Sequence, residues 1–202
     1  MEDSKIPSGE GERRAQRGYV PQYDLGARVI YEALASGKLA WIGIADRSAG
    51  PFDDIVLGLN DRIAAHQVKT SRDPAPFSIR TILLGAEGLL DRMIHARREL
   101  SRGHPGEIIE TIYVCDDYPR SDDNIFGSGP SISSAAFLRA HEHHRQVWSL
   151  AEWRASPYAS FISDIQAACD LDDAQFEMAW RHTRFVVSGP WALSRSRHVQ
   201  RW

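Results

Sequence analysis

Two short stretches of the sequence place acidic, amide and cationic side chains inside otherwise apolar segments. Asp53 and Asp54 open the segment "FDDIVLGL", and Gln67 and Lys69 stand near the end of "RIAAHQVKTS". Charged side chains are seldom found in apolar strands unless they are paired or bind a metal ion, because removing their water is costly. These four residues are therefore the first candidates for a functional site.

Strand geometry predicts that these side chains converge. If the two segments pair as antiparallel strands across a turn at Asn60 and Asp61, the start of the first lies beside the end of the second. Alternation puts Gln67 and Lys69 on one face of the second strand, beside Asp54. Oxygen ligands for a divalent cation next to an ammonium group are what hydrolysis of a phosphodiester needs. In this hypothesis Asp54 and Gln67 hold Mg²⁺ or Mn²⁺, and Lys69 offsets the charge that builds up on the phosphate.

A structural explanation of the same residues needs no ligand. It is a salt bridge between Asp54 and Lys69, with Gln67 at the margin of a sheet. For an arbitrary hairpin this explanation is the more common one. The residue types alone leave both interpretations open.

The rest of the chain supplies the elements that must position these side chains. Leu25, Val29 and Ala33 recur at helical spacing before Gly37, and glycine is favoured just after a helix end. Short apolar runs separated by "SAGP" and "ND" predict a meander of strands. The expected elements are, in chain order, a helix from after Pro21 to near Gly37, strands over 39–46, 52–59 and 62–71, a long helix over 78–102, a strand over 107–117 and helices from 131 onward.

This order predicts an α/β fold with a mixed central sheet flanked by the first helix and the 78–102 helix, plus a C-terminal helical extension. The near-continuous apolar run of 107–117 is typical of a central strand covered on both faces. Residues 1–16 carry almost no apolar side chains, so we expect a disordered lead, a core over 17–130 and the helical extension over 131–202. A chain of 202 residues with 43% hydrophobic content has room for one ordinary core.

Several of these motifs carry a resemblance to a known family. Acid at the head of one strand, followed after a turn by Gln-x-Lys on the next, resembles the PD-(D/E)XK nuclease motif, with Asp54, Gln67 and Lys69 in its three positions. "RGYVPQY", "FDDIVL", "HQVKTS", "FSI" and "YVCDDYPRSDD" together look like the double-stranded DNA endonuclease domain of bacterial anti-phage proteins. That domain is the N-terminal effector of CBASS (CD-NTase-associated) endonucleases and of defence NTPases of the STAND (Avs-like) and HerA-associated types. The resemblance covers about residues 17–190.

The resemblance implies a restriction-endonuclease-like fold and Mg²⁺-dependent hydrolysis of double-stranded DNA with low sequence specificity, in anti-phage defence. It implies that Asp54 and Gln67 hold the metal, with Asp53 assisting. Lys69 would stabilise the transition state and orient or help deprotonate the water. Gln67 departs from the generic acid of the motif, because it keeps an oxygen ligand but lacks a negative charge. The site should therefore hold metal more weakly unless another residue contributes.

The first helix offers two such residues. Members of the family often place Gln or Glu from this helix near the metal, which by position points to Gln22 and Glu32. The structural alternative for Gln22 is a helix-start residue that caps its own backbone. For Glu32 it is a solvated helix face.

Basic side chains near these motifs are candidates for DNA contacts. Arg72 follows the Gln-Val-Lys strand, and Arg97 and Arg98 lie on the 78–102 helix with Arg92 and Arg102. A solvated face is the alternative for the helical arginines. The formal net charge of −3 argues against a protein that coats nucleic acid by bulk charge, but it allows a local basic patch.

Other motifs carry less chemistry. "HEHHR" at 141–145 invites a zinc site, but only His141 and His144 share a helical face, and a run of His on a solvated helix needs no metal. The acids of "CDDYPRSDD" are more often turn residues, so they are left out of the site. The sequence has no Walker GxxxxGK[ST], GxGxxG or GxSxG motif, so NTPase, dinucleotide-binding and serine-hydrolase functions lack support.

Cys115 and Cys169 stand alone, and no stretch resembles a signal peptide or a membrane span. We therefore expect a cytoplasmic protein with reduced thiols and no membrane partner. In the family, sensing resides in a C-terminal module or a partner protein, and no such module fits after residue 190. We expect a sensor or NTPase module either in a longer full-length chain or in a separate partner.

A rival hypothesis is a catalytically silent nucleic-acid-binding or oligomerisation module with the same fold. Intact Asp54 and Lys69 argue against it, and Gln67 argues slightly for it. A single metal site of this type cuts one strand, so a double-strand break needs two domains, and we expect a homo-oligomer. The tryptophans that either pair two copies or form a core of their own are Trp148, Trp153, Trp180 and Trp191.

Overall fold

The computed structural model describes residues 10–71, 73–85, 88–126 and 131–187; within its first helix the side chains of 10–19, 21, 22 and 25 lie outside the description. The elements are α1 (Glu10–Ala35), β1 (Leu39–Ile44), the 3₁₀ helix η1 (Arg47–Phe52), β2 (Ile55–Leu59), β3 (Ile63–Lys69), β4 (Pro76–Phe77), α2 (Ile79–Leu84), α3 (Leu89–Gly103), β5 (Ile109–Cys115), β6 (Tyr118–Pro119), α4 (Ser134–His144), α5 (Leu150–Ala155), α6 (Ala159–Cys169), α7 (Asp173–Arg181) and β7 (Thr183–Val187).

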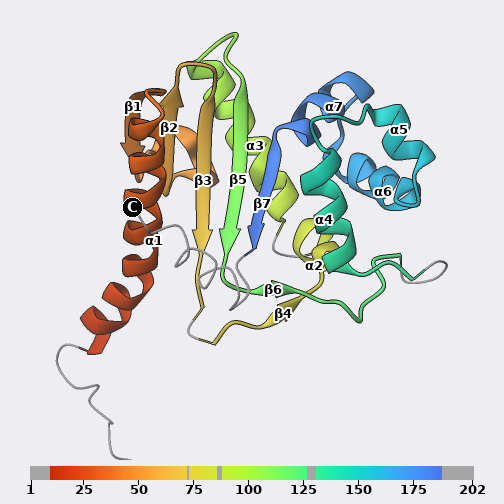
Figure 1. The fold of residues 1–202 in the computed structure, drawn as a ribbon, viewed down its shortest axis with the longest axis horizontal. Helices are drawn as coiled ribbons and strands as arrows, with labels where there is room; N and C mark the ends of the chain where they lie inside the picture. Colours follow the sequence, from red (N-terminus) through yellow and green to blue (C-terminus); the bar gives the residue numbers. More distant parts are fainter. Residues whose placement is uncertain (1–9, 72, 86–87, 127–130, 188–202) are drawn as a thin grey trace, which may run out of the picture.

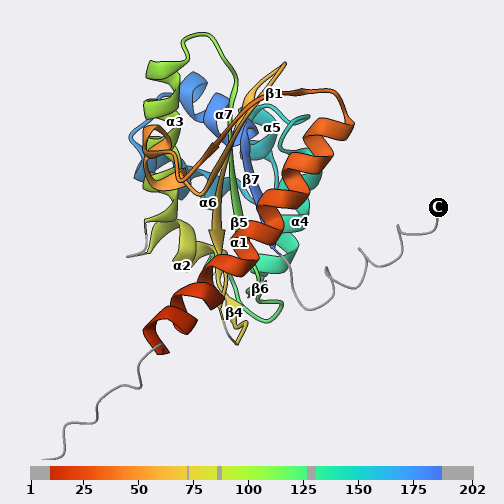
Figure 2. The same ribbon diagram turned by 90° about the vertical axis from the view of Figure 1, so that its left-hand side faces the viewer.

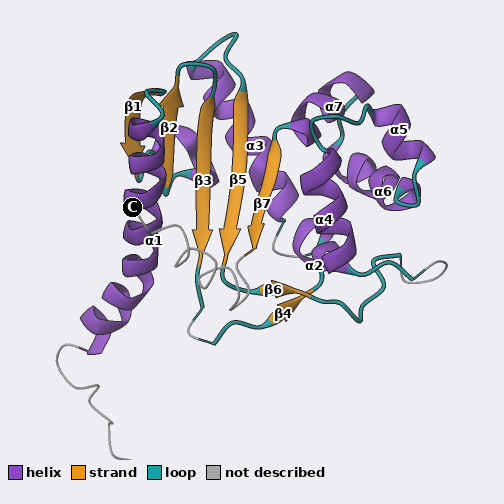
Figure 3. Cartoon of the chain, in the orientation of Figure 1, coloured by secondary structure: helices purple, strands orange, loops and turns teal. Residues whose placement is uncertain are grey.

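A mixed five-stranded sheet with the order β1-β2-β3-β5-β7 forms the centre of the fold (Figures 1 and 3). β1, β2 and β3 form an antiparallel meander, whereas β5 and β7 run parallel to β3. The β2–β3 pairing places Ile55 opposite His66, so the expected hairpin across Asn60 and Asp61 is confirmed. Every residue of β5 is buried, as expected for a central strand.

Helices cover both faces of this sheet (Figure 2). Val56 and Ala65 face the main core, which also contains Met93 of α3. Ile55 alternates to the other face and packs with Ala33 of α1. The predicted class, a mixed central sheet flanked by helices, is therefore confirmed.

The first helix begins earlier than the sequence pattern predicts. α1 runs from Glu10 to Ala35, so the expected start after Pro21 is wrong, and residues 10–16 are helical rather than a disordered lead. Glu, Arg, Ala and Gln dominate "EGERRAQR", and these residues favour helix even without apolar periodicity. The end is confirmed, since Gly37 takes a φ of 65° just beyond the helix.

The expected 78–102 helix is two helices. α2 ends at Leu84 and α3 starts at Leu89. Gly88 caps the start of α3 with a φ of 55°, a left-handed conformation that interrupts a helix and favours glycine. The break lets α3 take its own direction across the sheet.

The chain beyond residue 131 is not wholly helical. Its last described element, β7, pairs with β5 and adds an edge strand that the sequence pattern did not predict. The main core contains residues from both sides of residue 131, because Phe137, Phe161 and Phe176 belong to the same cluster as Val56.

Two tryptophans of this region, Trp153 and Trp180, belong to the core. Trp153 and Trp180 are only 1% and 3% exposed. Trp148 is partly buried and stacks on His144, while Trp191 lies outside the described residues. Of the two alternatives, the core is therefore the correct one for Trp153 and Trp180, and they join the main core instead of forming a separate one.

Candidate functional site

Asp54 stands where β3 extends beyond its last partner on β2. Its Oδ2 accepts a hydrogen bond from the Val68 backbone N–H at 2.7 Å and another from the Gln67 side-chain amide. Ile55 and His66 form the last β2–β3 pair, so beyond this pair the Val68 N–H donates to the Asp54 carboxylate instead of to a backbone carbonyl of β2. The hairpin therefore brings Asp54 and Gln67 together, as alternation predicts.

The carboxyl group of Asp54 has a raised pKa. Burial is the main cause, because an ionised carboxylate loses water there, and the negative charge of Asp53 adds to it. The Val68 N–H, the positive charge of Lys69 and the Gln67 amide act in the opposite direction. Lys69 is thus electrostatically coupled to Asp54, as both the functional and the salt-bridge interpretations require.

Gln67 is the most enclosed polar residue of the site, at 4% exposure. Its NH₂ group donates to Asp54, and its Oε1 accepts a hydrogen bond from Nη2 of Arg92 at 2.8 Å. Arg92 lies on α3, where only tertiary packing brings it to β3. The sequence grouped Arg92 with the basic residues of a solvated helix, and no local signal marks its contact with Gln67.

Lys69 and Asp53 flank this pair. Lys69 is the last residue of β3, is exposed, and belongs by alternation to the same face as Gln67. Asp53 directly follows η1 as its C-cap, and its carbonyl oxygen accepts from the Asp46 backbone N–H at 2.9 Å. The site therefore combines a half-buried carboxylate, a buried amide and a solvent-facing ammonium.

The donor set matches a hard divalent cation in type but not in orientation. Mg²⁺ takes one or two carboxylates together with water and phosphate oxygens, so Asp54 with a Gln67 oxygen is sufficient. In the structure, however, Gln67 turns its NH₂ group, not its oxygen, toward Asp54. A shared ion would require the amide to rotate about its last torsion, which is a broad and soft one.

Of the two residues expected from α1, the structure describes the side chain of Glu32 alone, and it does not lie at this site. Glu32 is exposed and forms an ion pair with Arg28 at 3.0 Å, the solvated helix face that was its alternative. α1 approaches the start of β2 at Gly26, because a Cβ at Gly26 would lie 3.3 Å from Ile55 Cδ1. Gln22 falls within α1, but its side chain lies outside the described part.

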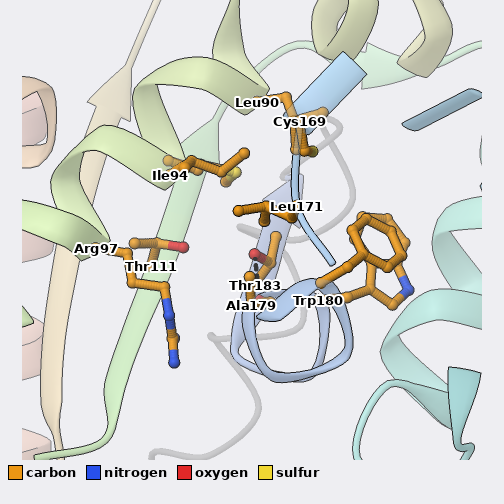
Figure 4. A pocket seen from close by; sticks show the side chains of 11 residues that line it. Leu90, Ile94, Arg97, Thr111, Cys169, Leu171, Ala179, Trp180 and Thr183 are labelled. Carbon is orange, nitrogen blue, oxygen red and sulfur yellow. Dashed lines mark hydrogen bonds between the residues drawn. The ribbon is translucent and has the colours of Figure 1, made fainter. Parts of the chain in front are cut away.

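The arginines expected to contact DNA are placed differently from one another. Arg97 is half-buried and donates to the Ile109 carbonyl oxygen at 2.6 Å, and burial lowers its pKa. It also lines a cavity of about 10 Å³, room for about one water, between α3, α7 and β5 (Figure 4). Arg98 is exposed on α3, whereas Arg72 lies outside the described residues. Arg97 thus links α3 to the start of β5.

The acids after β5 hold loops together, in agreement with their interpretation as turn residues. Asp116 accepts from the Ser71 backbone N–H at 3.0 Å, and Asp117 accepts from the Ala75 backbone N–H at 2.8 Å. These bonds hold Ser71 and Ala75, which follow β3, next to the end of β5. Asp123 similarly binds the backbone and hydroxyl of Ser134 at the start of α4.

Within the histidine run of α4, His141 is buried among aromatic rings, whereas His143 is exposed. His141 is 1% exposed, and its ring centroid lies 4.5 Å from that of Trp180 and 5.2 Å from that of Phe185. The expected solvated helix face is therefore wrong for this residue. Burial lowers its pKa to about 3. Among the described residues, no group of three or more His, Cys, Asp or Glu side chains is placed to hold a metal ion.

Comparison with protein-family models, with curated proteins and with solved structures finds no match for this chain. Within the described helices, none is both long enough and apolar enough to cross a bilayer.

Proposed function

We propose that this chain is a divalent-metal-dependent endonuclease that hydrolyses phosphodiester bonds of double-stranded DNA. One observation carries the proposal: Asp54, Gln67 and Lys69, which resemble the PD-(D/E)XK motif, meet at the end of the β2–β3 hairpin. The helix, antiparallel meander, helices and parallel strand around them support a restriction-endonuclease-like fold.

In the proposed reaction the residues divide the chemistry. Asp54, and Gln67 once its oxygen is turned inward, would hold Mg²⁺ or Mn²⁺, which when bound polarises the phosphate and lowers the pKa of water. Water oxygen forms a bond to phosphorus and loses a proton, while the bond from phosphorus to the leaving sugar oxygen breaks and that oxygen is protonated. Lys69, exposed at the strand end, stabilises the added negative charge on the phosphate oxygens.

The wider role rests on the resemblance. Low sequence specificity, action in bacterial anti-phage defence, homo-oligomerisation and dependence on a sensor or NTPase module all belong to the proposal. Of the expected DNA contacts, Arg98 is exposed on α3 and remains a candidate. Lys69 adds a positive charge at the exposed end of β3.

The contact between Arg92 and Gln67 favours a second candidate, a catalytically silent nucleic-acid-binding or oligomerisation module. In the described arrangement the Gln67 oxygen is already bound to a guanidinium group. A protein that never binds metal has no need to release the Gln67 oxygen from Arg92.

A plasmid assay distinguishes the two functions. Supercoiled DNA is incubated with the wild-type chain in Mg²⁺, in Mn²⁺ and in EDTA, beside Lys69→Ala. Metal-dependent nicking by the wild type that Lys69→Ala reduces about 100-fold or more supports the nuclease. Salt-dependent DNA binding with no cleavage in either metal, at any concentration of the chain, would identify the silent module instead.

A further inference from the structure

Arg92 reaches the candidate site from the first turns of α3. Its backbone N–H donates to the Gly88 carbonyl oxygen at 3.0 Å, which fixes the turn from which the side chain extends. Its Nη2 donates to Gln67 Oε1 at 2.8 Å and to the Pro51 carbonyl oxygen at 3.4 Å. The guanidinium group therefore bridges η1 and β3 through two oxygen acceptors.

These contacts fix the orientation of the Gln67 amide from both sides. An ionised Asp54 only accepts hydrogen bonds, and Arg92 only donates them. The NH₂ group of Gln67 must therefore face Asp54, and its oxygen must face Arg92. The reverse orientation would set oxygen against carboxylate and NH₂ against guanidinium, so it is excluded while both neighbours are in place.

This orientation conflicts with metal binding. A divalent cation beside Asp54 needs the Gln67 oxygen on the side where the NH₂ group now lies. Turning the amide breaks its bond to Arg92 and leaves a guanidinium facing an NH₂ group. The positive charge of Arg92 would also lie close to the cation and repel it.

We propose that Arg92 and the divalent cation compete for the amide oxygen of Gln67, so that Arg92 holds the site in a metal-free arrangement until it is displaced. This inference rests on the proposed function and adds a regulatory device to it. Arg92 is a positioning residue, since it acts through Gln67 and not on the reacting atoms.

Metal affinity, measured without DNA, tests the competition. Mn²⁺ is titrated into the chain and free aqueous Mn²⁺ is followed by electron paramagnetic resonance. Arg92→Met removes the charge but keeps the length of the apolar stem, and Arg92→Lys restores a charge. Arg102→Met is the matched control, because Arg102 is an exposed residue of the same helix that pairs with Glu99. Asp54→Ala reports binding elsewhere on the chain, and circular dichroism with thermal melting establishes that each variant is folded.

The expected result is a Kd for Mn²⁺ at least 10-fold lower in Arg92→Met, near the wild-type value in Arg92→Lys, and within 2-fold of it in Arg102→Met. An Asp54-dependent Kd that is unchanged or higher in folded Arg92→Met would overturn the competition but leave the metal site standing. If Arg92→Met does not fold, Arg92→Gln takes its place and the same 10-fold criterion decides. Mn²⁺ binding that is absent, or that is equal in wild type and Asp54→Ala, would overturn the proposed metal site and the competition together.

Discussion

Substitution of Asp54 separates its role in the fold from its role in the proposed reaction. Asp54→Ala deletes the acceptor of the buried Val68 N–H and of the Gln67 amide. An orphaned buried donor costs about 1–3 kcal/mol and two donors lose their acceptor, so we expect a loss of at least about 2 kcal/mol in the free energy of unfolding, or roughly 5 °C or more in Tm for a chain of this size. Cleavage should be lost as well, because the proposed metal ligand is gone.

Asp54→Asn should behave differently in the two assays. Its amide oxygen can accept both hydrogen bonds, and the variant carries no buried charge. The raised pKa of Asp54 means that the folded state disfavours the ionised carboxylate, so the stability that this group contributes is present at low pH and lost as the pH rises through its folded pKa. At pH 7, Asp54→Asn should therefore be as stable as the wild type or slightly more stable, while cleavage is still abolished.

Urea unfolding at pH 7 and plasmid nicking in Mg²⁺ measure the two effects on the same samples. Equal stability of the alanine and asparagine variants would refute the hydrogen-bonding role of the carboxylate. Wild-type nicking by Asp54→Asn would refute its assignment as a metal ligand.

Three further outcomes are expected. Lys69→Ala should keep its Tm within about 2 °C, because the side chain is exposed, yet lose about 100-fold or more in cleavage rate; early melting with wild-type nicking would instead support the salt-bridge interpretation. Gln67→Glu should remain active and require less Mg²⁺, because it adds a charged ligand, and a folded but inactive variant in a Mg²⁺ titration would contradict this. The pKa of His141 falls from 6.5 to about 3 in the folded state, so the folded protein keeps this residue neutral at a pH where the unfolded chain takes up a proton. The stability that neutral His141 contributes is therefore complete above pH 6.5 and is lost as the pH falls. Between pH 7 and 5 the free energy of unfolding should drop about 2 kcal/mol more in the wild type than in His141→Phe, and equal slopes in urea titrations would count against it.

Local patterns in the sequence were sufficient for much of the fold. The short apolar runs on either side of "ND" were sufficient to predict the β2–β3 hairpin, because a tight turn pairs consecutive strands side by side. Alternation along these strands brought Asp54 next to Gln67. The helix ahead of Gly37 and the buried β5 also followed from periodicity and composition.

Other elements depended on contacts between distant segments. The sequence "RFVV" becomes strand β7 because β5 offers it a free edge, and a short apolar run does not by itself distinguish strand from helix. His141 was placed on a solvated helix by its neighbours in "HEHHR", whereas aromatic rings from α7 and β7 bury it.

The site shows the same division. The sequence alone determined that a carboxylate, an amide and an ammonium converge at the end of one hairpin, because adjacent strands fix that geometry locally. Only the tertiary structure decided which way the Gln67 amide faces, because that depends on Arg92, a side chain from α3 that lies 25 positions along the chain. Such a contact requires the packing of a helix on a sheet, and no periodicity in the sequence encodes it.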